Sequence, residues 1–348
     1  MMKMTESKSG EYIVAVTVSP HSSLACPFFA LCYNTVMEPR IVFMGTPEFA
    51  LPALQMLCAR YPVVGVVTQP DRPAGRGRRL LASPVKQLAL AEGIPVFQPE
   101  RLKRQEAVEQ VRAWLPDVII VAAFGQILPP AVLEIPRYGV LNIHASLLPR
   151  WRGAAPIQAA ILAGDAVTGV TIMQLDAGLD TGPLLAQREV AIEPEETAGD
   201  LEERLAQLGA ELLVEILPKY LAGSLRPRPQ PQQGITMTRR LSKQAAALDW
   251  GRPAEELARQ VRACAPQPGA YTLWGEQRLK ILRARALREF ECASAEPGTV
   301  CVWQNLPAVV TAEGALLLLQ LQAAGKRPLN GAAFLRGRRA IVGAVLGP

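Results

Sequence analysis

Three polar side chains in this sequence have the types and spacing needed to act together on a carbonyl group. Asn142 and His144 stand two positions apart, so strand alternation would point both side chains to one face. An amide and an imidazole that project together can both donate hydrogen bonds to a developing oxyanion. Asp180 lies in a turn between Gly178 and Gly182, and its carboxylate could orient the imidazole and favour the protonated ring.

The histidine and cysteine content argues against a metal centre. The chain has two histidines, His21 and His144, and this number cannot supply several imidazoles for a zinc or iron site. The six cysteines form no C-x-x-C pair and are too sparse for a disulfide framework, which is typical of a reducing compartment. We therefore expect no metal.

Two common enzyme arrangements are disfavoured by the motifs around these residues. A dinucleotide site would require Gly-x-Gly-x-x-Gly after the first strand, but only Gly45 is present and Pro47 removes an amide donor. Ser146 lacks the Gly-x-Ser-x-Gly elbow of a serine hydrolase, and its position two residues beyond His144 is poor for proton transfer. We expect neither a nicotinamide cofactor nor a serine nucleophile.

The elements that must position the polar residues follow an alternating pattern. Helical periodicity between apolar runs predicts a doubly wound, mostly parallel sheet of Rossmann-like type. The clearest helix covers residues 197–217 and begins with a capping pair, Thr197 and Asp200. Asn142, His144 and Asp180 all follow or end a strand, so we expect them at the carboxyl edge, where such sheets bind ligands. The strand candidates are 40–44, 63–68, 118–122, 140–144, 169–175 and 184–190.

The composition changes after residue 224. Alternating prolines at 227, 229 and 231 favour an extended and stiff connection, so we assign residues 225–241 to a linker. Residues 242–262 contain an amphipathic helix, and short strands separated by Gly and Pro predict a small OB-like barrel. The barrel strand candidates are 270–274, 279–283, 299–303, 308–310 and 315–321.

The expected domains are a catalytic domain at 37–224, the linker, and a second domain at 242–348. Residues 1–36 do not resemble the rest, and we expect a flexible extension or a misplaced start, with Met37 as the working start. Pro20 and His21 interrupt the apolar segment, which argues against an export signal. His21 is therefore not expected to take part in catalysis.

Length, hydropathy and charge restrict the class of protein. The chain has 348 residues, of which 49% are hydrophobic and 20% charged, as expected of a soluble protein with two folded domains. No uncharged stretch approaches the roughly 20 apolar residues of a membrane span. Residues 1–218 carry a net charge of −5 and residues 219–348 a net charge of +11. A basic C-terminal part indicates a polyanionic partner, although a merely well-solvated surface remains the simpler alternative.

Four motifs together resemble the methionyl-tRNA formyltransferase family. The resemblance runs from about Met37 to the end of the chain. The Asn-His-Asp set is shared by all folate-dependent formyltransferases, whereas the second motif and the basic C-terminal domain are specific to the tRNA-directed branch. The motifs are Met-Gly-Thr-Pro at 44–47, Gln-Pro-Asp-Arg-Pro-Ala-Gly-Arg-Gly at 69–77, Asn-x-His-x-Ser-Leu-Leu-Pro at 142–149, and Leu-Asp-Thr-Gly-Pro at 179–183.

The resemblance implies a catalytic set of Asn142, His144 and Asp180 in a Rossmann-like domain followed by an OB-like barrel. It implies 10-formyltetrahydrofolate as formyl donor and the amino group of methionine on initiator tRNA as acceptor, with no metal and no nucleotide. It also implies a cytoplasmic protein, which we expect to be monomeric. The residues that would bind the folate are Phe124, Gly125, Gln126, Ile127, Leu128, Ser146, Leu147, Leu148 and Pro149.

The same resemblance assigns the basic residues to tRNA. The loop around Gly75 and Gly77 would insert at the end of the acceptor stem, where arginine can pair with phosphate or stack on a base. Further basic residues after position 277 would extend the surface that follows the phosphates. The residues expected to contact tRNA are Arg72, Arg76, Arg78, Arg79, Arg239, Arg240 and Lys243.

Two other functions explain part of the pattern. A formyltransferase that acts on a small amine would account for the three polar residues but leaves the basic C-terminal domain unexplained. An RNA-binding module on an inactive Rossmann-like body would account for the charge but not for the polar residues.

Overall fold

The computed structural model describes residues 3–6, 12–15, 38–74, 79–290 and 295–347, and its contacts divide the chain into two units after Met37. In the first unit, β1 (Lys3–Glu6) pairs antiparallel with β2 (Tyr12–Ala15). Apart from these two strands, the residues of the expected extension, His21 among them, lie outside the described residues. The flexibility expected for residues 1–36 stays a prediction.

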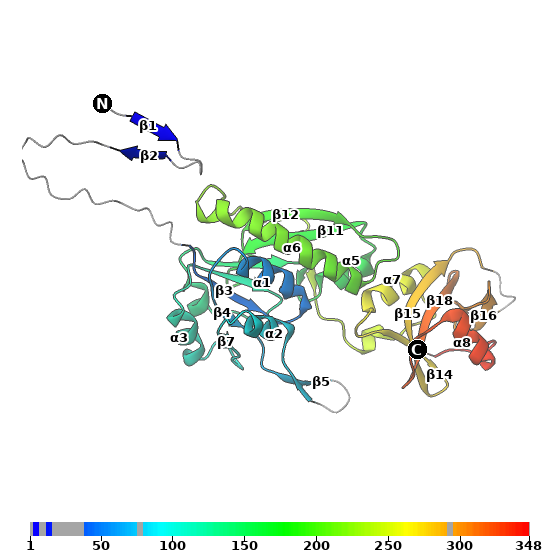
Figure 1. The fold of residues 1–348 in the computed structure, drawn as a ribbon. Coiled ribbons are helices and arrows are strands. Elements are labelled where there is room, and N and C mark those ends of the chain that lie inside the picture. Colours follow the sequence, from blue (N-terminus) through cyan, green and yellow to red (C-terminus); the bar gives the residue numbers. More distant parts are fainter. Residues whose placement is uncertain (1–2, 7–11, 16–37, 75–78, 291–294, 348) are drawn as a thin grey trace, which may run out of the picture. The chain divides into compact units, whose positions relative to one another are not determined.

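A seven-stranded mixed sheet forms the centre of the first half of the second unit (Figure 1). Its strand order is β12-β11-β9-β8-β3-β4-β7, and the five strands from β9 to β7 are parallel. All six predicted strands are present, and two have the predicted bounds. The strands are β3 (Ile41–Gly45), β4 (Val63–Val67), β7 (Val96–Phe97), β8 (Val118–Ala122), β9 (Val140–His144), β11 (Val167–Gln174) and β12 (Leu184–Ala191).

The direction of β11 corrects one expectation. β11 runs antiparallel to β9, with Thr171 opposite His144 and Gln174 opposite Leu141. The carboxyl end of β11 therefore lies beside the amino end of β9, so the prediction that Asp180 follows a strand end at the same edge as His144 is wrong. Apolar runs predict that a strand exists but carry no information on its direction, and the connection after β11 doubles back to bring Asp180 to His144.

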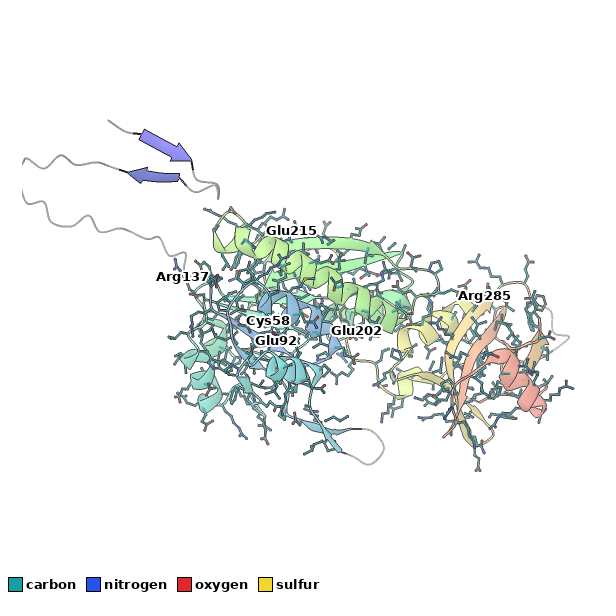
Figure 2. The ribbon with its side chains drawn as sticks, viewed as in Figure 1. Cys58, Glu92, Arg137, Glu202, Glu215 and Arg285 are labelled. Atoms are coloured by element: carbon teal, nitrogen blue, oxygen red, sulfur yellow. The ribbon has the colours of Figure 1, made fainter. Side chains whose placement is uncertain are left out.

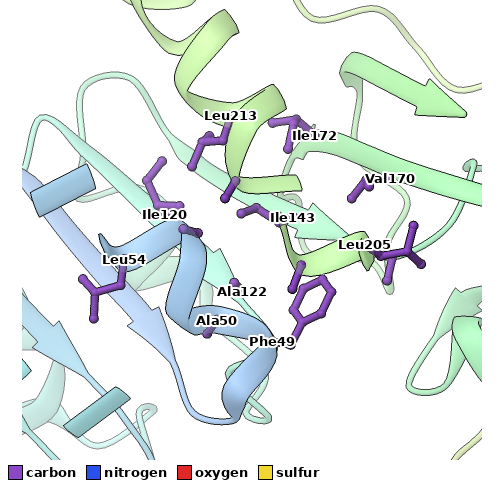
Figure 3. Close-up of a cluster of buried hydrophobic side chains, with 14 of the residues drawn as sticks. Phe49, Ala50, Leu54, Ile120, Ala122, Ile143, Val170, Ile172, Leu205 and Leu213 are labelled. Carbon is purple, nitrogen blue, oxygen red and sulfur yellow. The ribbon is translucent and has the colours of Figure 1, made fainter. Parts of the chain in front are cut away.

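Helices cover both faces of the sheet. One face packs against helices α1, α2, α5 and α6, and the other against α3 and α4, as expected of a doubly wound fold. Figure 3 shows part of the first core, where Ile143 of β9 lies among side chains from α6 and β11. The helices are α1 (Leu51–Cys58), preceded by the 3-10 turn η1 (Glu48–Ala50), α2 (Pro84–Ala91), α3 (Gln105–Ala113), α4 (Pro130–Leu133), α5 (Pro156–Ala163) and α6 (Ala198–Leu221).

Helix α6 begins at the capping pair that the sequence predicts. The Thr197 hydroxyl accepts a hydrogen bond from the Asp200 main-chain N–H at 3.3 Å, and the Asp200 carboxylate accepts one from the Thr197 main-chain N–H at 3.1 Å. Gly209 lets this helix approach the sheet closely, because a Cβ there would lie 2.5 Å from Cγ2 of Ile143. The helix thus packs directly against the strand that carries Asn142 and His144.

The proline-rich segment lies against the first half of the unit. Arg228 exchanges two main-chain hydrogen bonds with Leu184, at 2.7 and 2.8 Å. β13 (Met237–Thr238) pairs parallel with β10 (Arg152–Gly153). A separate two-stranded hairpin is formed by β5 (Arg72–Ala74) and β6 (Arg79–Leu81).

The C-terminal half contains an antiparallel sheet with its own core, in agreement with the predicted barrel. Main-chain hydrogen bonds join Gly347 to Leu273 of the first strand and Ala344 to Val300 of the last, so the final segment connects the two edges. The elements are η2 (Gln244–Ala246), α7 (Ala254–Cys264), β14 (Ala270–Trp274), β15 (Gln277–Leu287), β16 (Val300–Trp303), β17 (Leu306–Val310), β18 (Ala315–Ala323), β19 (Leu329–Asn330), α8 (Gly331–Gly337) and η3 (Arg339–Ile341).

None of the helices in the described part of the chain is long and apolar enough to cross a bilayer.

Candidate active site

Asn142 and His144 project from β9 to the face opposite Ile143, as the strand alternation predicts. Both side chains are buried, and Val140 on the same face belongs to the core beneath them. Within the ranges that the structure describes, the Asn142 side chain makes no hydrogen bond. An amide without a protein partner is available to hydrogen-bond a bound molecule.

The imidazole of His144 is held through one ring nitrogen. Its Nε2 lies 3.0 Å from the main-chain oxygen of Trp151. A carbonyl oxygen can only accept, so Nε2 carries the hydrogen and the neutral ring has a bare Nδ1. Nδ1 faces Oδ2 of Asp180 at 3.8 Å, which is too long for a direct hydrogen bond. Nδ1 is therefore the ring atom that can exchange a proton with a third group.

Burial decides the charge of this imidazole. Removal from water lowers the pKa of His144 below its ordinary value of 6.5, while the negative charge of Asp180 and the Trp151 carbonyl act in the opposite direction. The lowered pKa means that the neutral ring predominates at pH 7. The sequence-based expectation that Asp180 favours the protonated form is correct in sign, but burial outweighs it.

Asp180 is placed by main-chain contacts. Its Oδ2 accepts a hydrogen bond from the Gly153 N–H at 2.8 Å, and its own main-chain oxygen accepts one from Gln230 Nε2 at 2.8 Å. The residue has φ of +51°, in the left-handed region that few residues other than glycine adopt. These contacts bring the three predicted catalytic residues to one place, although they come from a strand and a returning loop.

Trp151 is itself fixed from three directions. Its main-chain N–H donates to Thr236 Oγ1 at 2.8 Å, and its indole Nε1 donates to Asp165 Oδ2 at 2.8 Å. The guanidinium of Arg150 lies 4.3 Å from the indole ring and forms two hydrogen bonds with Asp165, at 2.6 and 2.8 Å. Burial raises the pKa of Asp165, but these hydrogen bonds outweigh burial and leave the pKa below its ordinary value.

Sequence reasoning did not find the supporting residues. Trp151 and Gly153 stand in the polar cluster around residues 142–153, but nothing in their types indicated a main-chain role. Asp165 and Gln230 carry no local signal at all, because their partners lie 14 to 78 residues away.

The predicted folate loop follows β8. Ala123 and Gly125 have positive φ angles of +47° and +84°, which turn successive peptide groups of the loop. Phe124 and Leu128 are buried in the core of this face, and the side chain of Gln126 bonds the main chain of Pro99 and Leu102. Ile127, by contrast, is 88% exposed.

The segment Ser146 to Pro149 is the other predicted folate contact. The Ser146 hydroxyl is fully buried and donates to the main-chain oxygen of Arg150 at 2.6 Å, so it is not aimed at the imidazole. Leu148 packs against Met173 and Leu184. Leu147 and Pro149 are half-buried.

The residues predicted to contact tRNA fall into two groups. Arg72 on β5 is exposed, and Arg76 and Arg78 lie outside the described residues. The main chain of Arg79 belongs to β6. The second group is exposed on the segment after β13 and consists of Arg239, Arg240 and Lys243. Figure 2 shows a further basic side chain, Arg285, on β15.

Two cysteine thiols in the described part of the chain are poor nucleophiles. Burial raises the pKa of Cys58 to about 11, with a further contribution from the charge of Glu92, which lies close to it in Figure 2. Burial raises the pKa of Cys264 to about 11 as well. Both are protonated at neutral pH.

No group of three or more His, Cys, Asp and Glu residues that could hold a metal occurs among the described residues.

Family models and solved structures match most of the chain. The formyl transferase model matches residues 40–217, and the formyl transferase C-terminal domain model matches residues 240–339. A sugar 3N-formyltransferase, WlaRD, solved with dTDP and 5-N-formyl-THF, aligns with a TM-score of 0.59 at 18% identity, over 83% of this chain and 99% of that one. HypX from Aquifex aeolicus, solved with tetrahydrofolic acid, aligns with a TM-score of 0.58 at 20% identity, over 86% of this chain and 47% of that one. At these identities the solved structures show a common fold.

Curated relatives are much more similar. A methionyl-tRNA formyltransferase from Halorhodospira halophila is 52% identical over 312 residues, which is 88% of this chain and 99% of the relative. One from Thiobacillus denitrificans is 53% identical over 310 residues, with the same two shares. One from Myxococcus xanthus is 49% identical over 303 residues, covering 87% of this chain and 96% of the relative. With matching domain models and this identity over about 88% of its length, the chain belongs to the methionyl-tRNA formyltransferase family.

Proposed function

We propose that this chain transfers the formyl group of 10-formyltetrahydrofolate to the methionyl amino group of initiator Met-tRNA, producing the formylmethionyl-tRNA that starts translation. The observation that carries the proposal is the identity of about 50% to methionyl-tRNA formyltransferases along nearly their whole length. The basic C-terminal half favours a tRNA acceptor over a small amine, because a small amine needs no second domain of net positive charge.

The amide of Asn142 is the proposed oxyanion donor. When the methionyl amine attacks the formyl carbon, the carbonyl oxygen gains negative charge, and a donor fixed beforehand lowers the energy of that state. The side chain of Asn142 supports this role, because it forms no hydrogen bond within the described residues and is free to donate one to a bound molecule.

His144 is the proposed carrier of the proton. The neutral Nδ1 takes a proton from the attacking nitrogen, and the resulting imidazolium is stabilised by Asp180, whose Oδ2 lies 3.8 Å away. The protonated Nδ1 can then donate to the oxyanion beside Asn142 or return the proton to the folate nitrogen as it leaves. The carbon–nitrogen bond to folate breaks, the bond to methionine forms, and one proton moves from the amine to the folate.

The folate is a substrate of the proposed reaction, and the loop after β8 is its proposed binding site. The main-chain groups of Ala123 and Gly125 and the apolar side chain of Ile127 face solvent. Beneath them, Phe124 and Leu128 form a buried apolar layer. An apolar slot with main-chain donors and acceptors suits a flat pterin ring. The side chain of Gln126 is already bonded within the protein, so its contribution would come from the main chain.

The proposed tRNA contacts are the hairpin around Arg72, Arg76, Arg78 and Arg79 and the exposed residues Arg239, Arg240 and Lys243. Arg72 and the second group are exposed, so phosphate can reach them. The function further suggests a monomer in the cytoplasm, where initiator tRNA is charged.

Transfer of labelled formyl from the folate donor to charged initiator tRNA tests the function. We expect transfer to the tRNA but not to free amino sugars, and the reverse preference would overturn the tRNA assignment. Asn142→Ala should lower kcat by about 10² to 10³ while tRNA binding persists. Gln207→Ala, which removes an exposed amide on α6, is the matched control. Unchanged kcat in Asn142→Ala would remove the catalytic role assigned to this residue.

A further inference from the structure

One side chain of the proline-rich segment reaches into the site. Gln230 is 6% exposed, whereas the neighbouring Gln232 and Gln233 are exposed. Its Oε1 accepts two hydrogen bonds from Arg152, from Nε at 3.1 Å and from Nη2 at 2.7 Å. Its Nε2 donates two, to the main-chain oxygens of Asp180 at 2.8 Å and Gly182 at 2.7 Å.

These four contacts use the full hydrogen-bonding capacity of a primary amide. The oxygen of Gln230 has two lone pairs and the nitrogen two hydrogens, and all are engaged. A glutamate could still pair with Arg152 but would place a negative oxygen against two carbonyl oxygens. An asparagine is one methylene shorter and cannot span both sides. The position therefore selects glutamine.

Gln230 contacts both segments that support the Asp180 carboxylate. Gln230 holds the main chain of Asp180 directly. It also holds Arg152, and the next residue, Gly153, donates its N–H to Asp180 Oδ2 at 2.8 Å. The segment is anchored on either side, by Arg228 against Leu184 and by Thr236 against Arg152 and Pro149. Without these contacts, nothing local would keep an aspartate in the left-handed region at φ of +51°.

We propose that Gln230 is a positioning residue, which holds the Asp180 carboxylate beside His144. The proton-transfer site is then intact only when the linker is packed against the catalytic domain. The inference rests on the proposed role of Asp180 in formyl transfer. Displacement of the segment that leads to the C-terminal domain would release the carboxylate from the imidazole.

Steady-state kinetics of Gln230→Ala and Gln230→Glu in the full chain test whether Gln230 supports the rate of formyl transfer. We expect kcat to fall by about 10- to 100-fold in both, because small misplacements of reacting groups have effects of that size, with a smaller change in KM for tRNA. Gln232→Ala, the same change at an exposed position of the same segment, should keep the original kcat. Wild-type kcat in both Gln230 variants would overturn the proposal.

A second readout does not depend on formyl transfer. The chain has two histidines, so NMR titration of a His21→Ala background reports the imidazole of His144 alone. Asp180 raises the pKa of His144, opposing burial, so release of the carboxylate in Gln230→Ala should lower that pKa further. Gln232→Ala should leave it unchanged.

The kinetic and NMR measurements distinguish failure of the positioning role from failure of the proposed function. If the titration shifts and an assay finds no formyl transfer in any form of the protein, the positioning role stands and the proposed function fails. If the titration of a folded Gln230→Ala, checked by circular dichroism, does not shift, Gln230 does not position Asp180. Gln230→Glu keeps a partner for Arg152, so its behaviour distinguishes support of Asp180 from support of Arg152 alone.

Discussion

The Nε2 of His144 donates its hydrogen to the main-chain oxygen of Trp151, 3.0 Å away and seven residues further along the chain. This contact fixes the ring orientation and the tautomer, and it leaves Nδ1 to face Asp180. A single main-chain group thus decides which atom of the imidazole takes part in proton transfer.

The pH dependence of kcat should show the lowered pKa of His144. Nδ1 must be unprotonated to accept the proton of the amine, so activity is retained above the pKa and falls below it. Burial places that pKa below 6.5, and the acid limb of the profile should lie there. Asp180→Asn removes the charge that raises the pKa of His144, so its acid limb should move to still lower pH. A limb above pH 6.5, or a shift in the other direction, would contradict this assignment.

Asp165→Asn should destabilise the protein and lower kcat. It weakens the two hydrogen bonds with Arg150 and the one from the Trp151 indole, which together hold the carbonyl that orients His144. Arg150 is partly exposed, so we expect a loss of about 1 kcal/mol in the free energy of unfolding. The pKa of Asp165 lies below its ordinary value of 3.8, so its stabilisation is present above that pH and is lost as pH falls further.

Denaturant unfolding and kcat at pH 7 measure both effects. Glu109→Gln, which neutralises an exposed carboxylate on α3, should change neither quantity measurably. A wild-type kcat in a destabilised Asp165→Asn would separate this cluster from the orientation of His144.

Gly209→Ala should destabilise the catalytic half. The added Cβ would lie 2.5 Å from Cγ2 of Ile143 and 3.2 Å from Cγ1 of Val170, so α6 or β9 must shift. Overpacking of this kind costs about 1–3 kcal/mol, measured as a lower midpoint of denaturant unfolding. Gly337→Ala is the matched control, because it also lies in a helix but has no atom within 4 Å. Its expected effect is neutral or stabilising by up to about 1 kcal/mol.

Binding of tRNA should depend on salt through the exposed basic residues. For each phosphate contact, the slope of log K against log salt concentration becomes more negative by about 0.7 to 0.9. Arg239→Ala and Arg240→Ala should each reduce the slope by about that amount. Arg112→Ala, at an exposed position of α3, should leave it unchanged. If the salt-dependence slope is the same in all variants, residues 239 and 240 do not contact tRNA phosphates.

Local pattern was sufficient to predict the elements and part of the site. Buried parallel strands appear as continuous apolar runs, and strand alternation alone puts Asn142 and His144 on one face. The Thr197 and Asp200 pair marks the start of α6 because a capping interaction spans only three residues. The motifs that surround these residues were enough to assign the family, and the domain models and relatives confirm that assignment.

Tertiary structure alone decided how the site is assembled. The antiparallel direction of β11 follows from how the chain returns to the sheet, so its strand pattern could not predict the reversed loop that carries Asp180. Gln230 contacts Asp180 across 50 residues, and the tautomer of His144 depends on a main-chain oxygen whose position no side-chain type encodes. Periodicity and capping report interactions within a few residues, whereas these contacts exist only once distant segments have packed together.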